Sequence, residues 1–258
     1  MQIIIYPAKK MRIDMETFSC SSMPAFLNQT LQIMEWIQSL SFAEQKKLWG
    51  CNDSIAQENA ERFARMDLYS HLTPSILAYD GIQYTSMGPS VFDDSQLEYV
   101  EHHLRILSGF YGLLRPLDGI VPYRLEMQAK AKVGETRNLY AFWGDLLYRS
   151  LLDESRIIIN LASQEYAKCI QPYLSSEDRF ITCVFGELEK GNIVQKGVYA
   201  KMARGDMVRY LAQVRAETPE ALKDFQLSGY RFDPARSTDT EFVFLRTAPP
   251  GKTPVRES

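Results

Sequence analysis

Hydrophobic positions along the chain follow two periods, one typical of buried strands and one typical of amphipathic helices. Short apolar runs rich in β-branched residues predict buried strands at residues 2–6, 156–162, 179–185 and 242–246. Apolar residues spaced three and four apart predict helices over residues 24–40, 139–152 and 198–215. This alternation of strands and helices favours a mixed α/β (α+β) fold, with a mixed sheet flanked by helices.

Boundary residues refine this pattern. Ser41 and Glu44 form a capping box and Gly50 a C-terminal stop, so residues 24–70 are expected to be helical. We also expect a strand over 75–84, broken at Asp80 and Gly81, a strand over 122–127, and a helix over 163–170 capped by Ser163. A short helix follows Thr218, and residues 242–246 form the edge strand.

The segment HLRILSGFYGLLRPLD (103–118) is the most distinctive part of the sequence. We expect a helix to end near Leu107, a tight turn at Gly109 and Gly112, and a second short helix from Leu113. This arrangement resembles the helix-hairpin-helix element of DNA-repair proteins, whose backbone amides hold a phosphate. Arg105 and Arg115 flank the turn, and Phe110 or Tyr111 at its tip offers apolar contact to DNA. The alternative is a purely structural turn.

Composition and length fit one folded domain over residues 1–258. Apolar residues make up 45% and charged residues 24% of the chain, as in ordinary globular proteins. No linker rich in Gly, Ser or Pro divides the chain, and the tail 247–258 is expected to be flexible. No apolar run reaches the roughly 18 residues that span a bilayer, and no signal segment is evident. We therefore expect a cytoplasmic protein without a membrane partner.

The sequence predicts neither a metal site nor a bound cofactor. The four cysteines are scattered without a CxxC pair, so we interpret them as reduced, mostly buried thiols. His102 and His103 are neighbours that cannot share a helical face. Neither GxGxxG nor GxxxxGK[ST] occurs, which leaves no dinucleotide fingerprint and no P-loop. GxSxG is also absent, and no serine has a histidine at a recognised spacing.

Charge is strongly segregated, although the net charge is only −3. Residues 1–12, 102–137 and 195–215 carry +3, +3 and +4, so these three windows hold +10 and the rest of the chain −13. If the fold joins the windows, they form one positive cleft that attracts an anion. The alternative is three separate solvated faces.

Individual basic residues stand out within these windows. Lys9 follows the first strand, and Arg124 lies in PYRLEM, where a salt bridge with Glu126 is the alternative to a ligand contact. Lys201 and Arg204 lie one helical turn apart on a shared face. They precede Gly205, which weakens a helix, and this favours a ligand contact over a solvated face.

The segment INLASQEY (159–166) offers a further group of candidates. Asn160 and Ser163 follow a buried strand, where an open α/β sheet usually binds its ligand. Glu165 and Tyr166 could supply an acid and a base. A capping serine and a core tyrosine remain equally good interpretations.

Six segments together resemble the bacterial peroxide-stress-resistance YaaA family: 103–118, PYRLEM (122–127), FWGDLL (142–147), INLASQEY (159–166), YAKMARG (199–205) and GYRF (229–232). The N-terminal strand followed by Pro7, Ala8 and Lys9 also fits. This resemblance implies a single cytosolic α/β domain, a role in limiting free iron and oxidative damage under hydrogen peroxide, and DNA binding through a positive cleft with a helix-hairpin-helix-like element.

Two functions from different classes remain open. The first is a stress protein that binds double-stranded DNA with little sequence preference, because backbone contacts carry no sequence information. The second is an enzyme with a basic pocket for a small phosphorylated or nucleotide-like substrate. An open groove wide enough for a duplex would favour the first, and a closed cavity of a few hundred Å³ the second.

Overall fold

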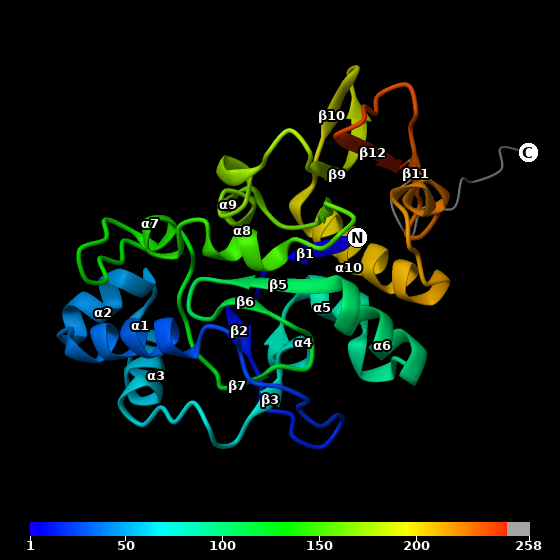
Figure 1. Ribbon diagram of the computed structural model, residues 1–258. Coiled ribbons are helices and arrows are strands. Elements are labelled where there is room, and N and C mark those ends of the chain that lie inside the picture. Colours follow the sequence, from blue (N-terminus) through cyan, green and yellow to red (C-terminus); the bar gives the residue numbers. More distant parts are fainter. Residues whose placement is uncertain (247–258) are drawn as a thin grey trace, which may run out of the picture.

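The centre of the computed structural model, which describes residues 1–246, is an eight-stranded sheet (Figure 1). Its strand order is β11 (Tyr230–Phe232), β12 (Glu241–Arg246), β9 (Arg179–Glu189), β8 (Ile157–Asn160), β1 (Gln2–Ile5), β5 (Leu104–Ser108) and β6 (Gly112–Leu114), with β10 (Asn192–Val194) paired to β9. The neighbours β12, β9, β8, β1 and β5 are parallel. The pairs β11/β12, β9/β10 and β5/β6 are antiparallel, so the sheet is mixed as predicted.

Ten α-helices accompany the sheet within the described residues. They are α1 (Leu27–Ser39), α2 (Phe42–Trp49), α3 (Asp53–Ala64), α4 (Ser75–Ala78), α5 (Ile82–Met87), α6 (Asp94–His103), α7 (Leu139–Trp143), α8 (Leu146–Leu151), α9 (Gln164–Ala167) and α10 (Gly197–Val214). Helices α1 to α3 gather at one end of the molecule, and α5, α6 and α10 lie together at another side (Figure 1). Two small ladders, β2 (Lys10–Met11) with β4 (Tyr79–Asp80) and β3 (Thr73–Pro74) with β7 (Gly119–Ile120), complete the fold.

Local signals placed several elements correctly. Strands β1, β8 and β9 and the helices α1 and α10 lie where the apolar patterns predicted them. The capping box of Ser41 and Glu44 is present, and Gly50 ends α2 in the left-handed conformation. The four cysteines are free thiols, of which Cys169 and Cys183 are buried and the other two half-buried.

The helix-hairpin-helix prediction for residues 103–118 is wrong. Helix α6 ends at His103, and the expected second helix is replaced by strand β6, so the segment is a β-hairpin. The apolar run after His103 pairs in parallel with β1, with Leu104 opposite Ile3 and Ile106 opposite Ile5. Burial within the sheet outweighs the local helical pattern, because β5 pairs through its edges with β1 and β6 and most of its side chains on both faces are buried.

Other boundaries also differ from the predictions. Residues 75–84 are mostly two short helices rather than a strand, and residues 122–127 are irregular. Gly144, at φ +52°, divides the expected helix 139–152 into α7 and α8. Strand β12 lies between β11 and β9, so β11 forms the edge instead. Residues 163–170 form only the short α9, and Ser163 makes no side-chain cap.

Two further points concern membrane-spanning helices and the C-terminal tail. No helix within residues 1–246 is long and apolar enough to cross a membrane. The predicted flexible tail, 247–258, lies outside the described residues.

Candidate functional site

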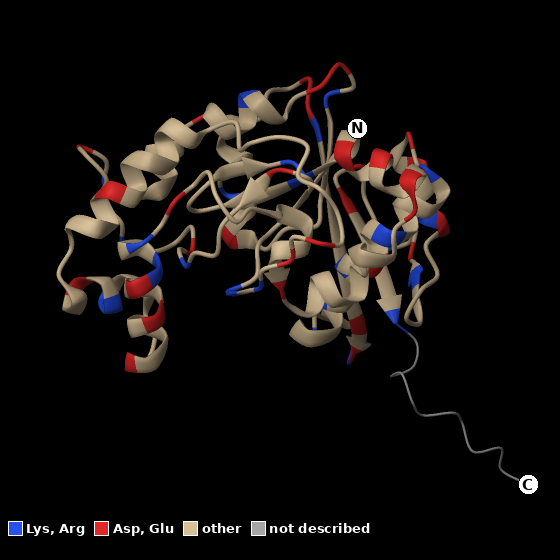
Figure 2. Ribbon diagram, turned by 90° about the horizontal axis from the view of Figure 1, so that it is seen from below, with Lys and Arg blue, Asp and Glu red and all other residues tan. Residues whose placement is uncertain are grey.

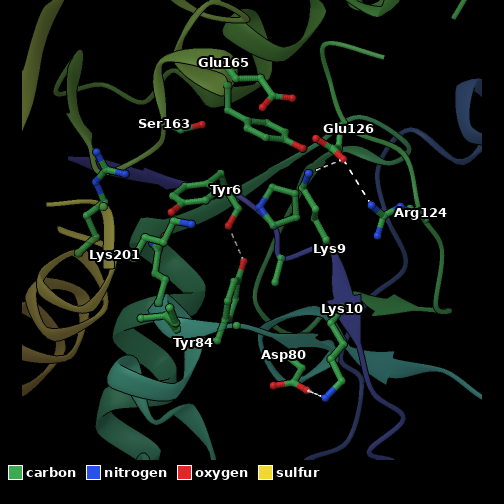
Figure 3. A pocket seen from close by; sticks show the side chains of 18 of the residues that line it. Tyr6, Lys9, Lys10, Asp80, Tyr84, Arg124, Glu126, Ser163, Glu165 and Lys201 are labelled. Carbon is green, nitrogen blue, oxygen red and sulfur yellow. Dashed lines mark hydrogen bonds and ion pairs between the residues drawn. The ribbon is translucent and has the colours of Figure 1, made fainter. Parts of the chain in front are cut away.

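One pocket of about 620 Å³ lies where the carboxyl ends of β1 and β8 meet helices α5 and α10 (Figure 3). Residues 6–10 enter it directly after β1, and Ser163, Glu165 and Tyr166 enter it after β8. Residues 80–84 and 123–128 supply further walls. The carboxyl edge of parallel strands is where open α/β sheets usually bind ligands. We call this site the central pocket.

Five basic side chains line the central pocket, and all three basic windows of the sequence contribute. We call them the pocket cations: Lys9, Lys10, Arg124, Lys201 and Arg204. Charged positions of both signs are otherwise spread over the whole chain (Figure 2). The fold therefore joins parts of the three windows around one cavity, while their remaining basic residues lie elsewhere.

Three carboxylates share the central pocket and pair with some of these cations. The Lys9 amine lies 2.8 Å from Glu126, and the Lys10 amine lies 2.6 Å from Asp80. The Arg124 guanidinium lies 3.8 Å from Glu126, which supports the salt-bridge interpretation of Arg124 in part. Among residues 1–246, Lys201 and Arg204 have no carboxylate within 4.0 Å, so the side of the pocket formed by α10 carries the unpaired positive charge.

The third carboxylate, Glu165, has a raised pKa. Partial burial raises it most and the charge of Glu126 raises it further, while the amide of Gln128 and the charge of Lys9 oppose the shift. Tyr166 beside it is buried, and burial raises its pKa well above the ordinary value, so its hydroxyl stays neutral. Of the proposed acid and base pair, only Glu165 is suited to exchange a proton, because its pKa is shifted towards neutral pH whereas that of Tyr166 is shifted away from it.

Aromatic rings form much of the remaining wall. Tyr6, Tyr84, Tyr123 and Tyr166 all line the pocket. The rings of Tyr6 and Tyr166 are stacked with centroids 6.1 Å apart, and the Arg204 guanidinium lies 5.8 Å from the Tyr6 centroid. The Tyr84 hydroxyl donates to the Tyr6 carbonyl at 3.0 Å, which anchors the segment after β1 to α5.

Gly205 positions the two unpaired cations. A Cβ atom on Gly205 would lie 2.1 Å from the carbonyl oxygen of Gln83, so only glycine lets α10 approach α5 this closely. Arg204 and Lys201 precede Gly205 on α10 and are brought to the pocket by this contact. The glycine that suggested a ligand contact thus acts through helix packing.

Neither of the hairpin glycines lines the central pocket. A Cβ on Gly109 would lie 2.8 Å from the Leu125 carbonyl oxygen, and one on Gly112 would lie 2.8 Å from the Trp143 ring. The amides of Phe110 and Tyr111 donate to the Ser108 hydroxyl. Both aromatic rings are buried, so the predicted contact of DNA with the hairpin tip is wrong.

Three other candidates also lie outside the pocket lining. The Arg105 guanidinium donates to the carbonyls of Glu101 and Leu104, where it closes the end of α6. Arg115 is exposed on the loop after β6. Asn160 is buried and bridges Thr182 and the amide of Ala162. The structure brings together these predicted candidates: Lys9, Arg124, Ser163, Glu165, Tyr166, Lys201 and Arg204.

Sequence reasoning missed Lys10, Asp80, Gln83 and Tyr84 as pocket residues. Lys10 follows Lys9 and could have been included from its position after β1. The other three lie on short elements without a clear period. Among residues 1–246, no three or more His, Cys, Asp or Glu side chains are grouped so that they could hold a metal ion.

Comparison of the sequence with known proteins decides the family. The family described as peroxide stress protein YaaA matches residues 1–236. The chain belongs to this family. A UPF0246 protein from Agathobacter rectalis is 52% identical, over 95% of this chain and 99% of the relative. A UPF0246 protein from Lachnoclostridium phytofermentans is 49% identical, over 95% of this chain and 96% of the relative. One from Lactiplantibacillus plantarum is 51% identical, over 95% of this chain and 99% of the relative. Membership confirms the resemblance and supports a role in peroxide stress.

Proposed function

We propose that this YaaA-family protein contributes to peroxide resistance in the cytoplasm by binding DNA at the mouth of the central pocket. The observation that carries the proposal is that five cations from distant segments gather around one cavity of a chain whose net charge is −3. With five cations and three carboxylates the pocket keeps an excess of positive charge, and a concave site focuses such a field on an anionic ligand. The DNA backbone is such a ligand.

The exposure of these side chains suits phosphate contacts. The side chains of Lys9 and Lys10 are 64% and 81% exposed, which places them at the mouth. Lys201 is exposed as well, and among residues 1–246 neither it nor Arg204 has a carboxylate to displace. Because phosphate contacts carry no sequence information, we propose binding with little sequence preference. The protection of DNA and the lower free iron that the family resemblance implies are proposed as consequences of this binding.

The size of the pocket favours a second candidate function, the binding or conversion of a small phosphorylated ligand. A volume of about 620 Å³ lies within the range of small-molecule sites, about 300–1,000 Å³. A duplex cannot enter a cavity of this size and would contact only its mouth. A small ligand would instead place its phosphate against Lys201 and Arg204 inside.

The salt dependence of DNA affinity tests the first proposal. With a fluorescent duplex and anisotropy as the measurement, log Kd should rise with log salt by about 0.9 per phosphate contact. Replacing Lys201 and Arg204 together by Ala should lower this slope by about two contacts and leave the melting temperature unchanged. The matched control is Lys47→Ala with Arg149→Ala, which removes the same charge at two residues that do not line the pocket.

Equal slopes for the two double variants would contradict DNA binding at the central pocket. A protein that binds only small phosphorylated ligands would give no change in anisotropy with any duplex. It would still be stabilised against heat by inorganic pyrophosphate, and the Lys201 and Arg204 variant would lose that stabilisation.

A further inference from the structure

We infer that the central pocket binds a nucleobase beside the phosphate, so that its ligand is a nucleotide unit whose base edge is recognised by Gln83. This inference rests on the proposed function, because it names the group that occupies the cavity beyond the phosphate.

Gln83 carries the argument. It lines the pocket from α5 and is only 3% exposed. Both atoms of its amide, Oε1 and Nε2, are buried without a hydrogen-bond partner among residues 1–246. Buried side-chain amides are nearly always paired, because an unpaired one has lost its water without compensation. A free donor beside a free acceptor is the pattern that glutamine uses to pair with the edge of adenine.

The fold holds Gln83 next to the unpaired cations. Its backbone carbonyl packs against Gly205 at a distance that no side chain would allow. Arg204, the residue before that glycine, also has a buried Nε without a partner among the described residues. One wall of the pocket therefore offers a positive charge and an amide pair together. A nucleotide carries the two complementary groups, a phosphate and a base edge.

The tyrosines supply a surface for the ring of the base. Tyr6 lies between Lys201 and Lys9 in the pocket (Figure 3), and its ring packs with Tyr166 and Arg204. Bases stack readily on aromatic side chains, and every base has a face for this contact. A phosphate alone would gain nothing from these rings.

Charge assigns the two ends of the ligand. Glu126 lies across the pocket from Lys201 (Figure 3), where Lys9 and Arg124 neutralise part of the charge of Glu126 and Glu165. A phosphate is therefore attracted most by the unpaired cations of α10, whereas hydroxyl and amino groups of a nucleoside can donate to the carboxylates. The charges of the pocket are thus arranged to match a nucleotide, with unpaired cations on the side for the phosphate and hydrogen-bond acceptors on the side for the nucleoside.

Calorimetry with three probes tests the inference: adenosine 5′-monophosphate, ribose 5-phosphate, which lacks the base, and adenosine, which lacks the phosphate. We expect the monophosphate to bind at least about fivefold more tightly than ribose 5-phosphate. Gln83→Met should remove most of that difference without weakening ribose 5-phosphate. Because the amide is unpaired, this variant should melt at the same temperature as the wild type or higher.

Gln45→Met is the matched control, because Gln45 is a buried glutamine whose Nε2 donates to the Ile37 carbonyl at 2.9 Å. It should lower the melting temperature and leave nucleotide affinity unchanged. A second test needs no variant. Purine riboside 5′-monophosphate lacks the exocyclic amine that donates to Gln83, and it should bind to the wild type more weakly than adenosine 5′-monophosphate although it can still stack on Tyr6.

Equal affinity for the monophosphate and ribose 5-phosphate, or full affinity in Gln83→Met, would overturn base recognition. DNA binding that depends on Lys201 and Arg204 would survive that outcome. Conversely, nucleotide binding that depends on Gln83 in a protein that binds no duplex would contradict only the proposed function.

Discussion

The β5–β6 hairpin and the central pocket contrast in how their polar groups are satisfied. In the hairpin, Ser108 accepts from the amides of Phe110 and Tyr111 at 3.1 and 2.9 Å, and its oxygen lies 2.6 Å from the Tyr123 hydroxyl. In the pocket, Gln83, Arg124 and Arg204 keep buried polar atoms without partners among residues 1–246. The polar groups of the hairpin are paired within the protein, whereas those of the pocket would find partners in the proposed ligand.

The sharpest test of this contrast is Gly112→Ala in the hairpin. Gly112 has a φ of +77°, and the new Cβ would meet Trp143 and Leu147 at 2.8 and 2.9 Å. We expect a loss of about 2–5 kcal/mol of stability, from the left-handed backbone together with overpacking. Chemical denaturation measures this loss. DNA affinity per folded molecule should not change.

Gly191→Ala separates the cost of the left-handed backbone from the cost of overpacking. Gly191 has a similar φ of +84°, but nothing lies within 4 Å of its added Cβ. It should lose only about 1–2 kcal/mol, the cost of the backbone conformation alone. If Gly112→Ala folds normally and loses DNA affinity, the hairpin takes part in binding and the contrast fails.

The same contrast explains how far the sequence could predict this protein. The pattern of apolar residues was sufficient for strands such as β1 and β8, because each is a short run buried on both faces. It failed at residues 104–108, where pairing with β1 decides between helix and strand and no local signal reveals the partner.

For the site, Lys9, Arg124, Lys201 and Arg204 could be chosen because charge is visible in a sequence. Gln83 could not be chosen, since its importance lies in the absence of a partner, which depends on tertiary packing. The glycines at 109 and 112 were misassigned because a glycine required by packing and one required by a ligand look alike in a sequence.

A pair of serines provides the second prediction. Ser108→Ala leaves two buried amides without an acceptor and should cost about 1–3 kcal/mol of stability. Ser163, which lines the pocket and makes no side-chain cap, should tolerate alanine within about 0.5 kcal/mol. Denaturation curves of the two variants compare them directly. Equal losses of stability would show that the Ser163 hydroxyl is paired within the protein as fully as the Ser108 hydroxyl, which would contradict the contrast.

The smallest expected effect concerns the pH dependence of DNA affinity. Burial and Glu126 raise the pKa of Glu165, so this carboxylate takes up a proton at a higher pH than an ordinary glutamate does. Protonation removes a negative charge from the pocket, while the phosphodiesters of DNA stay charged. Affinity should therefore increase as pH falls through that range, by roughly fivefold or less for one charge near the surface.

Glu165→Gln isolates this contribution, because the amide has the shape of the protonated acid at every pH. The variant should bind DNA more tightly than the wild type at neutral pH, and the two affinities should converge as the pH falls. None of the three histidines lines the pocket, and all three are common to both proteins. Parallel pH profiles of wild type and variant would show that Glu165 does not contribute to DNA binding.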